Sequence, residues 1–181
     1  MLEKNALRQL LQKRRENIPA AQRQQKSRRI HRKLFSEPCV RNAVHVAIYY
    51  GIRSEVATRS FLTELLKTKK VYLPKVDRKS RTISFHRVRH LIRDLRKSFY
   101  SIREPKAGCP RRSVEQMDVV IVPGVGFDRA CGRLGRGGGY YDRALRRAFK
   151  VPKIGLCFRE QLVKKVPVTK HDVRMDKIIT D

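Results

Sequence analysis

The residues best suited to chemistry stand together at positions 132–145, which read GRLGRGGGYYDRAL. Glycine adopts positive φ and leaves its N–H uncovered, so several in succession can aim backbone donors into one anion-binding hollow. Arg133 and Arg136 would add forked, fully charged donors, and a helix beginning nearby would add a partial positive charge. Asp142 is a nearby carboxylate for the Mg²⁺ that accompanies a nucleotide polyphosphate. The segment therefore predicts a phosphate cradle; the alternative is a surface loop that turns tightly into a helix.

The predicted cradle follows neither of the common glycine-rich patterns. A Walker A loop requires Gly-Lys-Ser/Thr, whereas Gly137 is followed by two further glycines. The dinucleotide spacing G-x-G-x-x-G also fails, because Gly135 and Gly137 are followed by Tyr140 at the last position. A dinucleotide enzyme and an ordinary P-loop ATPase are both disfavoured.

The cysteines and histidines offer no obvious metal or nucleophilic centre. The four cysteines are widely spaced without a C-x-x-C pair, which favours reduced thiols in a cytosolic protein. His86 and His90 are four apart and could share a helical face as metal ligands, but the arginines around them would repel a cation, so two surface histidines are favoured. His171 could act as an acid or a base, although a structural role is favoured.

The elements that must position the cradle alternate between helices and strands. Helices are expected at 3–17, 19–37, 55–68, 139–149 and near 161. Strands are expected at 44–50, 69–76, 82–88, 152–158 and 176–180, with 82–88 at a sheet edge and 90–116 as a long irregular connection. The stretch MDVVIVPGVGFD at 117–128 is the clearest signal, because a short apolar run ended by Pro-Gly is typical of a central parallel strand buried on both faces.

This alternation predicts an α/β fold, a three-layer α/β/α sandwich with a mostly parallel central sheet, formed by one domain over residues 1–181. Ligands of such sheets bind beyond the carboxyl ends of the strands. The glycine-rich run follows the central strand directly, so it falls where a site is expected.

The charge of the chain is unusual, since 44 Lys and Arg against 16 Asp and Glu give a formal net charge of +28. Such an excess attracts polyanions. The basic residues are spread over the whole length, without an RNP-like aromatic pattern, zinc spacing or helix-turn-helix signal, so nucleic-acid binding stays open but is not predicted. No apolar run approaches a membrane span or a signal-peptide core, so a cytoplasmic protein without membrane association is expected.

The stretch VPGVGFDRACGRLGRGGGYYDRAL at 122–145 resembles the signature of the 5-formyltetrahydrofolate cyclo-ligase family, also called 5,10-methenyltetrahydrofolate synthetases. The resemblance covers nearly the whole chain. Lys4 to Arg8 resembles the family's nucleotide-contacting K-x-x-x-R, and YYGIRSEVAT at 49–58 resembles its folate site. REPK at 103–106 and VPVTKHDVRMDKIIT at 166–180 match further segments. The remaining alternative is another ATP-using ligase or kinase of small molecules that shares the phosphate loop.

The resemblance implies an activity. This is ATP- and Mg²⁺-dependent conversion of 5-formyltetrahydrofolate into 5,10-methenyltetrahydrofolate, with ATP as co-substrate and release of ADP and phosphate. Phosphoryl transfer to the formyl oxygen would create a leaving group, which attack by N10 then expels. Such a reaction needs positioning and charge neutralisation rather than a protein nucleophile. The implied partners are ATP and the folate, whose tail can carry several glutamates, and a monomer is expected.

The resemblance also implies site residues. ATP would be bound by Lys4, Asn5, Ala6, Leu7, Arg8, Arg133, Leu134, Gly135, Arg136, Gly137, Gly138, Gly139, Tyr140 and Tyr141. The folate would be bound by Tyr50, Glu55, Arg136, Gly137, Gly138, Gly139 and Tyr140, with Arg136 and Tyr140 as the catalytic residues. Mg²⁺ would be held by Asp142 and Asp172.

Each of these roles has a structural alternative. Lys4 and Arg8 could belong to a solvated basic helix, and Asp172 could cap a turn. Glu55 would read the amino-pyrimidine edge of the pterin, but could instead be a first-turn glutamate of a helix. Tyr50 could be a buried strand residue. Lysines and arginines along 78–112 would steer both anionic ligands.

Overall fold

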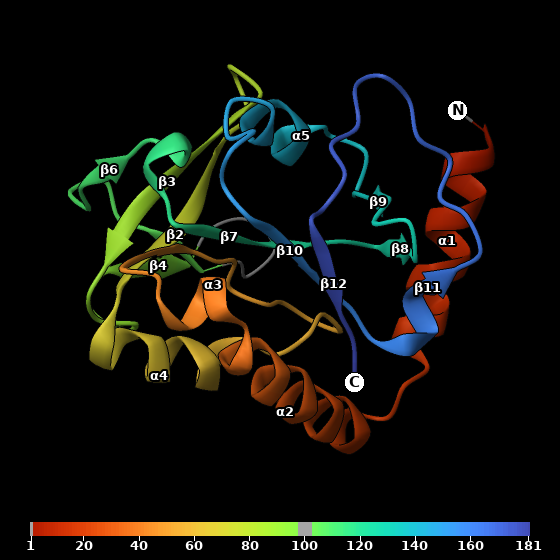
Figure 1. Ribbon diagram of the computed structural model, residues 1–181, viewed down its shortest axis with the longest axis horizontal. Helices are drawn as coiled ribbons and strands as arrows, with labels where there is room; N and C mark the ends of the chain where they lie inside the picture. Colours follow the sequence, from red (N-terminus) through yellow and green to blue (C-terminus); the bar gives the residue numbers. More distant parts are fainter. Residues whose placement is uncertain (1, 98–102) are drawn as a thin grey trace.

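The computed structural model describes residues 2–97 and 103–181, and a large sheet forms its centre (Figure 1). Within these residues the sheet has seven strands, in the order β12 (Lys177–Ile179), β10 (Lys153–Leu156), β7 (Val119–Pro123), β1 (His45–Ala47), β2 (Lys70–Asp77), β3 (Thr82–Val88) and β6 (Arg111–Arg112). Neighbouring strands from β12 to β2 are parallel, whereas β3 is antiparallel to both β2 and β6. The predicted, mostly parallel sheet is confirmed.

Strand β7 is the buried strand that the sequence predicted. Residues 119–122 are all fully buried. Val119 and Ile121 pack into the core on one face of the sheet, and Val120 and Val122 pack into the core on the other. Apolar side chains on both faces exclude water from β7, which is why its sequence shows no alternation. The strand ends at Pro123, and residues 124–131 connect it to the glycine-rich run at 132–145.

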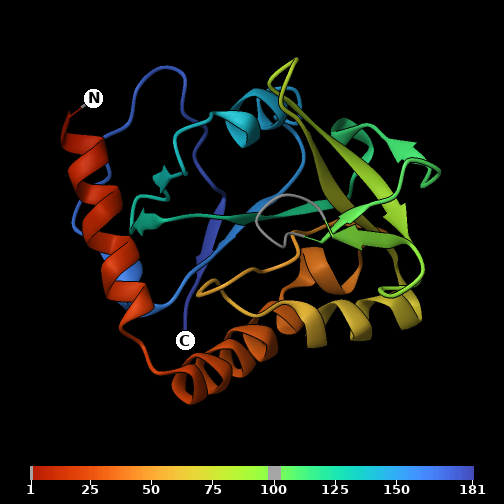
Figure 2. The ribbon, with the colours of Figure 1, turned by 180° about the vertical axis from the view of Figure 1, so that it is seen from behind.

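Helices cover both faces of the sheet, which confirms the three-layer α/β/α prediction (Figures 1 and 2). One face carries α2 (Ala20–Ser36), α3 (Pro38–Arg41) and α4 (Arg59–Thr68). Leu34 of α2 and Phe61 of α4, each at most 1% exposed, belong to the core cluster on that face. The opposite layer is thinner: it holds α5 (Tyr140–Leu145), whose Leu145 joins the core cluster that contains Val120 and Val122.

Helix α1 (Leu2–Glu16) lies at one end of the molecule, beside a small sheet (Figures 1 and 2). The strand order in that small sheet is β11 (Leu162–Val163), β8 (Gly126–Asp128) and β9 (Arg133–Leu134). Leu11 of α1 is fully buried and clusters with Val125, Leu134 and Val166. Burying one such leucine contributes about 2 kcal/mol. Because β9 begins the glycine-rich run, this packing fixes the N-terminal helix beside it.

Several predicted boundaries are wrong. The strand expected at 44–50 is only β1, and the helix expected at 55–68 begins at Arg59, so residues 55–58 belong to a loop. The side chain of Thr58 closes this loop by accepting the N–H of Gly51 and donating to the carbonyl oxygen of Tyr49. The helix expected at 139–149 ends at Leu145, after which the chain continues as tighter turns that reach back three residues.

The connection at 90–116 is not irregular throughout. Its described part contains β4 (Leu95–Lys97), which pairs with β5 (Arg103–Pro105), then β6 and the short helix η2 (Val114–Gln116); residues 98–102 of this prediction lie outside the described residues. β6 covers part of β3, so β3 is not a bare sheet edge. His86 lies on β3 and His90 beyond it, so the two do not share a helical face.

The C-terminal elements agree with the prediction, with η3 (Arg159–Gln161) near residue 161 and β12 as the last strand. All four cysteines are free. Among the helices that the structure describes, none has both the length and the apolar character that crossing a membrane requires.

Candidate active site

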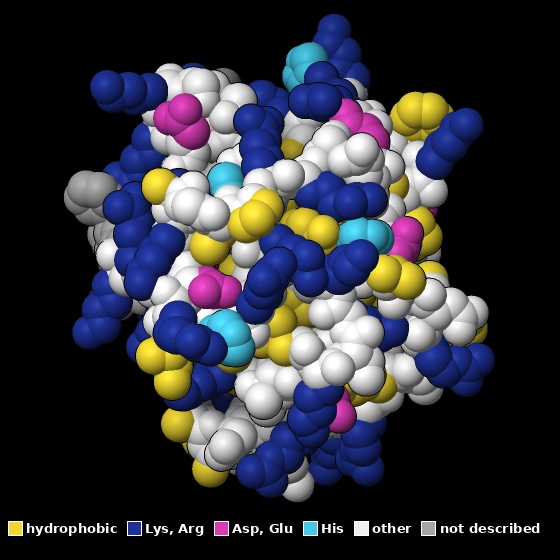
Figure 3. Space-filling model, turned by 90° about the vertical axis from the view of Figure 1, so that its left-hand side faces the viewer, with side chains coloured by type: hydrophobic (Ala, Val, Ile, Leu, Met, Phe, Trp, Pro, Cys, Tyr) yellow, Lys and Arg dark blue, Asp and Glu magenta, His cyan; other side chains and the backbone are white. Residues whose placement is uncertain are grey.

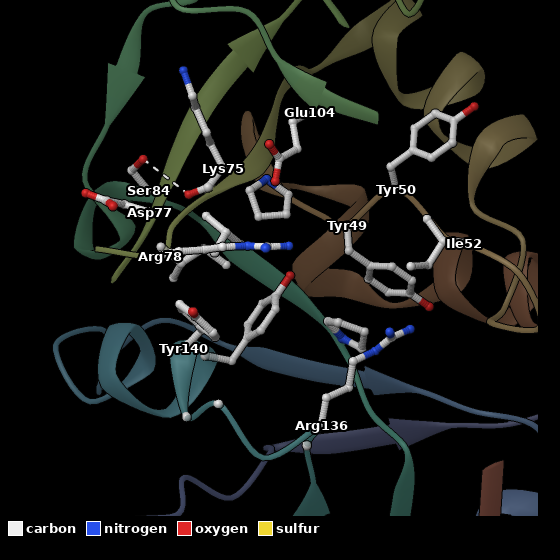
Figure 4. Close-up of a pocket in the computed structure, with 18 of the residues that line it drawn as sticks. Tyr49, Tyr50, Ile52, Lys75, Asp77, Arg78, Ser84, Glu104, Arg136 and Tyr140 are labelled. Carbon is white, nitrogen blue, oxygen red and sulfur yellow. Dashed lines mark hydrogen bonds between the residues drawn. The ribbon is translucent and has the colours of Figure 1, made fainter. Parts of the chain in front are cut away.

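A cleft of about 1200 Å³ opens at the carboxyl end of β7, where a ligand site was expected. Its lining combines residues 133–142, which we call the glycine segment, with the loop after β1, the β2–β3 hairpin and the β4–β5 ribbon; within the glycine segment, Leu134 and Gly137 do not line the cleft. Figure 4 shows Tyr140, Arg78 and Glu104 pointing toward the same space from three of these elements. The predicted site residues in the lining are Tyr50, Glu55, Arg133, Gly135, Arg136, Gly138, Gly139, Tyr140, Tyr141 and Asp142.

The glycine segment presents backbone donors without acceptors. Gly137 and Gly139 have φ values of 103° and 65°, which residues with side chains rarely adopt. Among the described residues, no acceptor receives the N–H of Gly137, Gly138 or Gly139. Successive free donors in changing backbone conformations form an anion-binding concavity. Because α5 is only six residues long, these amides, rather than a strong helix dipole, are what the segment offers an anion.

Helix α1 contacts the glycine segment from outside the cleft. The Nε of Arg8 donates to the carbonyl oxygen of Gly135 at 2.9 Å, and its Nη1 donates to Oδ1 of Asn5 at 2.6 Å. A Cβ built on Gly137 would lie 3.5 Å from Cζ of Arg8. Leu7 packs against the cluster that contains Leu134, whereas Ala6 is exposed. In the part of the chain that the structure describes, residues 4–8 do not line the cleft, so their ATP contact stays a prediction.

Arg133 and Asp142 form a buried ion pair within the glycine segment. Nη2 of Arg133 lies 2.8 Å from Oδ1 of Asp142, and the two side chains are 3% and 15% exposed. The carbonyl oxygen of Pro123 accepts a second hydrogen bond from Arg133 at 3.3 Å, and the guanidinium lies over the Tyr141 ring. Arg133 therefore ties the end of β7 to the start of α5. Arg136 is left as the exposed arginine of the segment.

Tyr141 belongs to the same segment and to the first turn of α5. Its hydroxyl is buried and has no hydrogen-bond partner among the described residues. Burial raises the pKa of Tyr141, with a smaller contribution from the Glu55 carboxylate, so the hydroxyl stays protonated.

Asp172 caps a turn, which was the structural alternative for this residue. Its Oδ2 accepts the backbone N–H of Thr169 at 2.6 Å, the Thr169 hydroxyl at 2.9 Å and the Lys4 ammonium at 2.5 Å. Burial alone would raise the pKa of Asp172, but Lys4 and Thr169 outweigh it and lower the pKa. The N–H of Val173 donates to Oδ1 of Asp142 at 3.2 Å, so the two predicted magnesium ligands lie on adjoining segments.

His171 lies beside this turn. Its Nδ1 is 3.1 Å from Nη2 of Arg146, which also donates to the His171 carbonyl oxygen at 2.9 Å. The side chain is exposed and does not line the described cleft, so the structural role favoured for His171 stays a prediction.

Glu55 and Arg136, both expected to bind the folate, contact each other across 81 residues of sequence. Nη2 of Arg136 donates to Oε1 of Glu55 at 2.6 Å, and Oε2 accepts the N–H of Ile52 at 3.2 Å. The Glu55 side chain is 9% exposed and that of Arg136 is 50% exposed. Because Glu55 precedes α4 by four residues, it is not a first-turn glutamate, and that alternative is wrong.

A buried arginine that sequence reasoning missed lies near Glu55. Arg15 of α1 is 3% exposed, and its Nε donates to the hydroxyl of Ser54 at 3.0 Å. Burial lowers the pKa of Arg15, and the Glu55 carboxylate opposes that effect. The run KRRE at 13–16 gives no sign of which cation turns inward. Arg15 is turned inward by its hydrogen bond to Ser54, which is 39 residues away in the sequence and therefore leaves no local pattern.

The far wall of the cleft is basic and was anticipated only as a steering region. Lys75 pairs with Ser84 across the β2–β3 hairpin, and His86 pairs with Arg111 across β3 and β6, so these side chains share one face. Figure 3 shows Lys and Arg side chains gathered over this side of the molecule. The lining residues that the prediction did not name individually include Lys75, Asp77, Arg78, Lys79, Ser84, His86, Arg96, Arg103, Glu104 and Arg111.

Tyr50 lies at the rim of the cleft. It packs partly against the core on the α2–α4 face. Figure 4 shows its hydroxyl pointing away from Tyr140 and Arg78. Because Tyr50 lies beyond the end of β1 and is only partly buried, the alternative of a buried strand residue is wrong. Any contact with folate would use the ring.

Comparison with known proteins identifies relatives over the whole chain. A sequence model of the 5-formyltetrahydrofolate cyclo-ligase family matches residues 1–181. The 5-formyltetrahydrofolate cyclo-ligase of Escherichia coli (strain K12) is 30% identical over 94% of this chain and 96% of its own. The NMR structure of 5,10-methenyltetrahydrofolate synthetase from Aquifex aeolicus has a TM-score of 0.87 at 35% identity, covering 99% of this chain and 89% of the other. The synthetase from Mycoplasma pneumoniae has a TM-score of 0.78 at 30% identity and covers 98% of both chains.

Proposed function

Since the chain belongs to the 5-formyltetrahydrofolate cyclo-ligase family, whose members convert 5-formyltetrahydrofolate into 5,10-methenyltetrahydrofolate using ATP, we propose that the cleft performs this reaction with the glycine segment holding the polyphosphate. The observation that carries this assignment is the row of free N–H groups on Gly137, Gly138 and Gly139 beside the exposed arginine, Arg136. Amide donors fixed before the substrate arrives stabilise phosphate charge without reorganising during the reaction.

The chemistry requires positioning more than a protein nucleophile. A formyl group on N5 is amide-like, so its oxygen leaves only after the γ-phosphoryl group has been transferred to it. N10 of the same folate then attacks the formyl carbon and loses its proton to solvent, and phosphate leaves with that oxygen, while ADP retains the former bridging oxygen. Negative charge builds on the transferred phosphoryl oxygens, where Arg136 can neutralise it. Tyr140, whose ring points into the cleft, can hydrogen-bond at the same place (Figure 4).

Glu55 reads the pterin in this proposal. A carboxylate accepts two hydrogen bonds from the amino-pyrimidine edge, and Oε1 and Oε2 of Glu55 already bond Arg136 and the Ile52 amide. The incoming pterin therefore replaces Arg136 at Glu55. The released guanidinium, half exposed on a glycine-rich segment, is then free to reach the phosphoryl group, which couples folate binding to charge neutralisation.

Free carboxylate oxygens support the proposal that Asp142, which lines the cleft, and Asp172, which lies outside the lining, hold a Mg²⁺ ion. Oδ2 of Asp142 and Oδ1 of Asp172 accept no hydrogen bond from any described residue. Mg²⁺ is held in nucleotide sites by one or two carboxylates together with waters and phosphate oxygens. When bound, the ion would neutralise phosphate charge. The two aspartates would orient it, and Arg133 and Lys4 hold their other oxygens in place.

The basic wall supports a further part of the proposal, that the folate carries several glutamates. Lys75, Arg96, Arg103 and Arg111 line the cleft together with one acid of the β4–β5 ribbon, Glu104. The carboxylates of a glutamate tail match this wall in charge. We also propose that residues 1–181 act as one unit, as a monomer in the cytoplasm, a compartment where free cysteines stay reduced.

An absorbance assay tests the proposed function. The full chain is mixed with ATP, Mg²⁺ and 5-formyltetrahydrofolate, and the absorbance of methenyltetrahydrofolate is followed. We expect the absorbance to rise only when ATP is present. The amount of ADP formed should equal the amount of methenyltetrahydrofolate formed. Folded protein that yields no methenyltetrahydrofolate, or that yields it without consuming ATP, would contradict the proposal.

A further inference from the structure

A second hollow, of about 540 Å³, lies between α2 and α4 and shares no lining residue with the cleft. Its lining residues are Gln25, Arg28, Arg29, His31, Arg32, Phe35, Ser60 and Phe61. The volume falls in the range of small-molecule sites, about 300 to 1000 Å³. The loop that carries Ile52 and Glu55 in the cleft continues directly into Ser60 and Phe61 of this hollow.

The cations of α2 divide into two groups, and only one group lines the hollow. Arg23 donates to backbone carbonyl oxygens, Lys26 pairs with Glu160 and Asp181, and Lys33 donates to the Thr180 carbonyl oxygen. These three secure the helix. The other three cations are exposed and, among the described residues, have no hydrogen-bond or ion-pair partner: Arg28, Arg29 and Arg32.

Three guanidinium groups line one hollow, and their charge and donor geometry match a phosphate group. Arg28 and Arg32 are one helical turn apart, and Arg29 and Arg32 are three residues apart, so the side chains reach the same surface. Arginine presents forked donors that match phosphate oxygens. No acid among the described residues lines the hollow, so an anion that binds there meets three positive charges and no negative one.

The hollow also has polar atoms without a hydrogen-bond partner among the described residues. His31 is 8% exposed, its Nδ1 lies 3.4 Å from the Ser60 hydroxyl, and its buried Nε2 has no partner among the described residues. The backbone N–H groups of Ser60 and Phe61, in the first turn of the ten-residue helix α4, also have no acceptor within the described residues. A helix of this length attracts anions to its N-terminus.

The apolar part of the hollow suits a ring. His31 lies 5.3 Å and Phe35 lies 4.5 Å from Phe61, measured between ring centroids. Phe61 is buried, and Phe35 is only partly buried at the surface of the core. An aromatic group carried by the ligand can pack on this cluster while its phosphate meets the arginines.

We propose that this hollow binds a small organic phosphate, with the phosphate on Arg28, Arg29, Arg32 and the first turn of α4, and the organic part against Phe35. The ligand is a free small molecule rather than a polynucleotide. The neighbouring cations of α2 are occupied by other contacts, so no continuous basic track extends the site along the helix. The site is independent of the cyclo-ligase reaction.

The test uses adenosine monophosphate as the probe and the ring nitrogen signals of His31 in the full labelled chain as the readout. This readout separates the hollow from binding in the cleft. We expect a saturable shift at physiological salt, with an affinity at least about tenfold weaker in Arg28→Gln/Arg32→Gln, because two charge-assisted contacts are lost. The matched control Arg14→Gln/Arg129→Gln removes two exposed arginines outside the hollow and should bind as the original chain does.

Three results would overturn the proposal. They are the absence of a saturable His31 shift, an equal loss in both double variants, and a shift produced by a single-stranded oligonucleotide but not by the monophosphate. Equal losses would mean that only the bulk charge attracts the probe. Cyclo-ligase activity of Arg28→Gln/Arg32→Gln, measured without the probe and expected to stay within about twofold, confirms that the variant is folded.

Discussion

Replacing Asp142 by asparagine should destabilise the fold as well as impair turnover. The change leaves the Arg133 guanidinium, 3% exposed, without its carboxylate partner at 2.8 Å. Breaking one partner of a buried ion pair costs about 3 to 5 kcal/mol. The asparagine oxygen can still accept from Val173 and Arg133, so the lower end, about 3 kcal/mol, is expected. For a domain of this size 1 kcal/mol corresponds to about 2 to 4 °C in Tm, so Asp142→Asn should lower Tm by about 6 to 12 °C.

Thermal unfolding followed by circular dichroism measures this effect, and two variants control it. Glu64→Gln makes the same acid-to-amide change in an exposed pair with Lys67, where the side chains are 54% and 63% exposed, and should cost at most about 1 kcal/mol. Adding Arg133→Met to Asp142→Asn removes the stranded charge and should restore most of the loss. A Tm for Asp142→Asn within about 2 °C of the original chain, or an equal fall in Glu64→Gln, would refute the reasoning.

Three further predictions concern the folate, the phosphate and acid stability. Glu55→Gln should raise the KM for 5-formyltetrahydrofolate by about tenfold or more, because a charge-assisted hydrogen bond contributes about 1.5 to 3 kcal/mol. ATP should still bind. An equal loss of ATP affinity, measured by calorimetry, would point to a structural role for Glu55. Gly137 has a φ of 103°, so Gly137→Ala should weaken ATP binding by about fivefold or more through backbone strain of about 1 to 3 kcal/mol. The control Gly108→Ala, which has open space around its Cβ position, should leave ATP binding unchanged. Equal effects of the two changes would remove the glycine segment from the site. Burial alone would raise the pKa of Asp181, but hydrogen bonds from Lys26 and the Arg159 amide outweigh burial and lower the pKa. The ionised Asp181 carboxylate therefore stabilises the fold fully above about pH 4, and this stabilisation is lost as the pH falls further. Urea unfolding should be measured between about pH 6 and about pH 3, the range in which carboxylates titrate. Over this range the free energy of unfolding should fall more steeply for the original chain than for Asp181→Asn. Parallel curves would contradict this assignment.

The parts of the fold that could be predicted are those with a strong local pattern. Residues 119–122 are continuously apolar because both faces of β7 are buried, and such a run is visible without any knowledge of its neighbours. The strands β4, β5 and β6 have two or three residues each, which is too few to show a period, and their pairing depends on partners elsewhere in the chain.

The candidate site divides in the same way. The glycine segment carries its own signal, because glycines and arginines are contiguous in the sequence. The contacts between Arg136 and Glu55 and between Arg15 and Ser54 join residues far apart, and no local pattern marks them. The residue pattern by itself gave Arg133 and Arg136 the same phosphate-binding role, whereas packing buries the first and leaves the second half exposed.

The amide signals of Gly137, Gly138 and Gly139 provide the most direct test of whether this loop grips a polyphosphate. In a labelled chain titrated with a non-hydrolysable ATP analogue and Mg²⁺, these three signals should move together and saturate at the concentration where the analogue is bound. Saturable binding of the analogue that leaves all three amide signals in place would contradict the account.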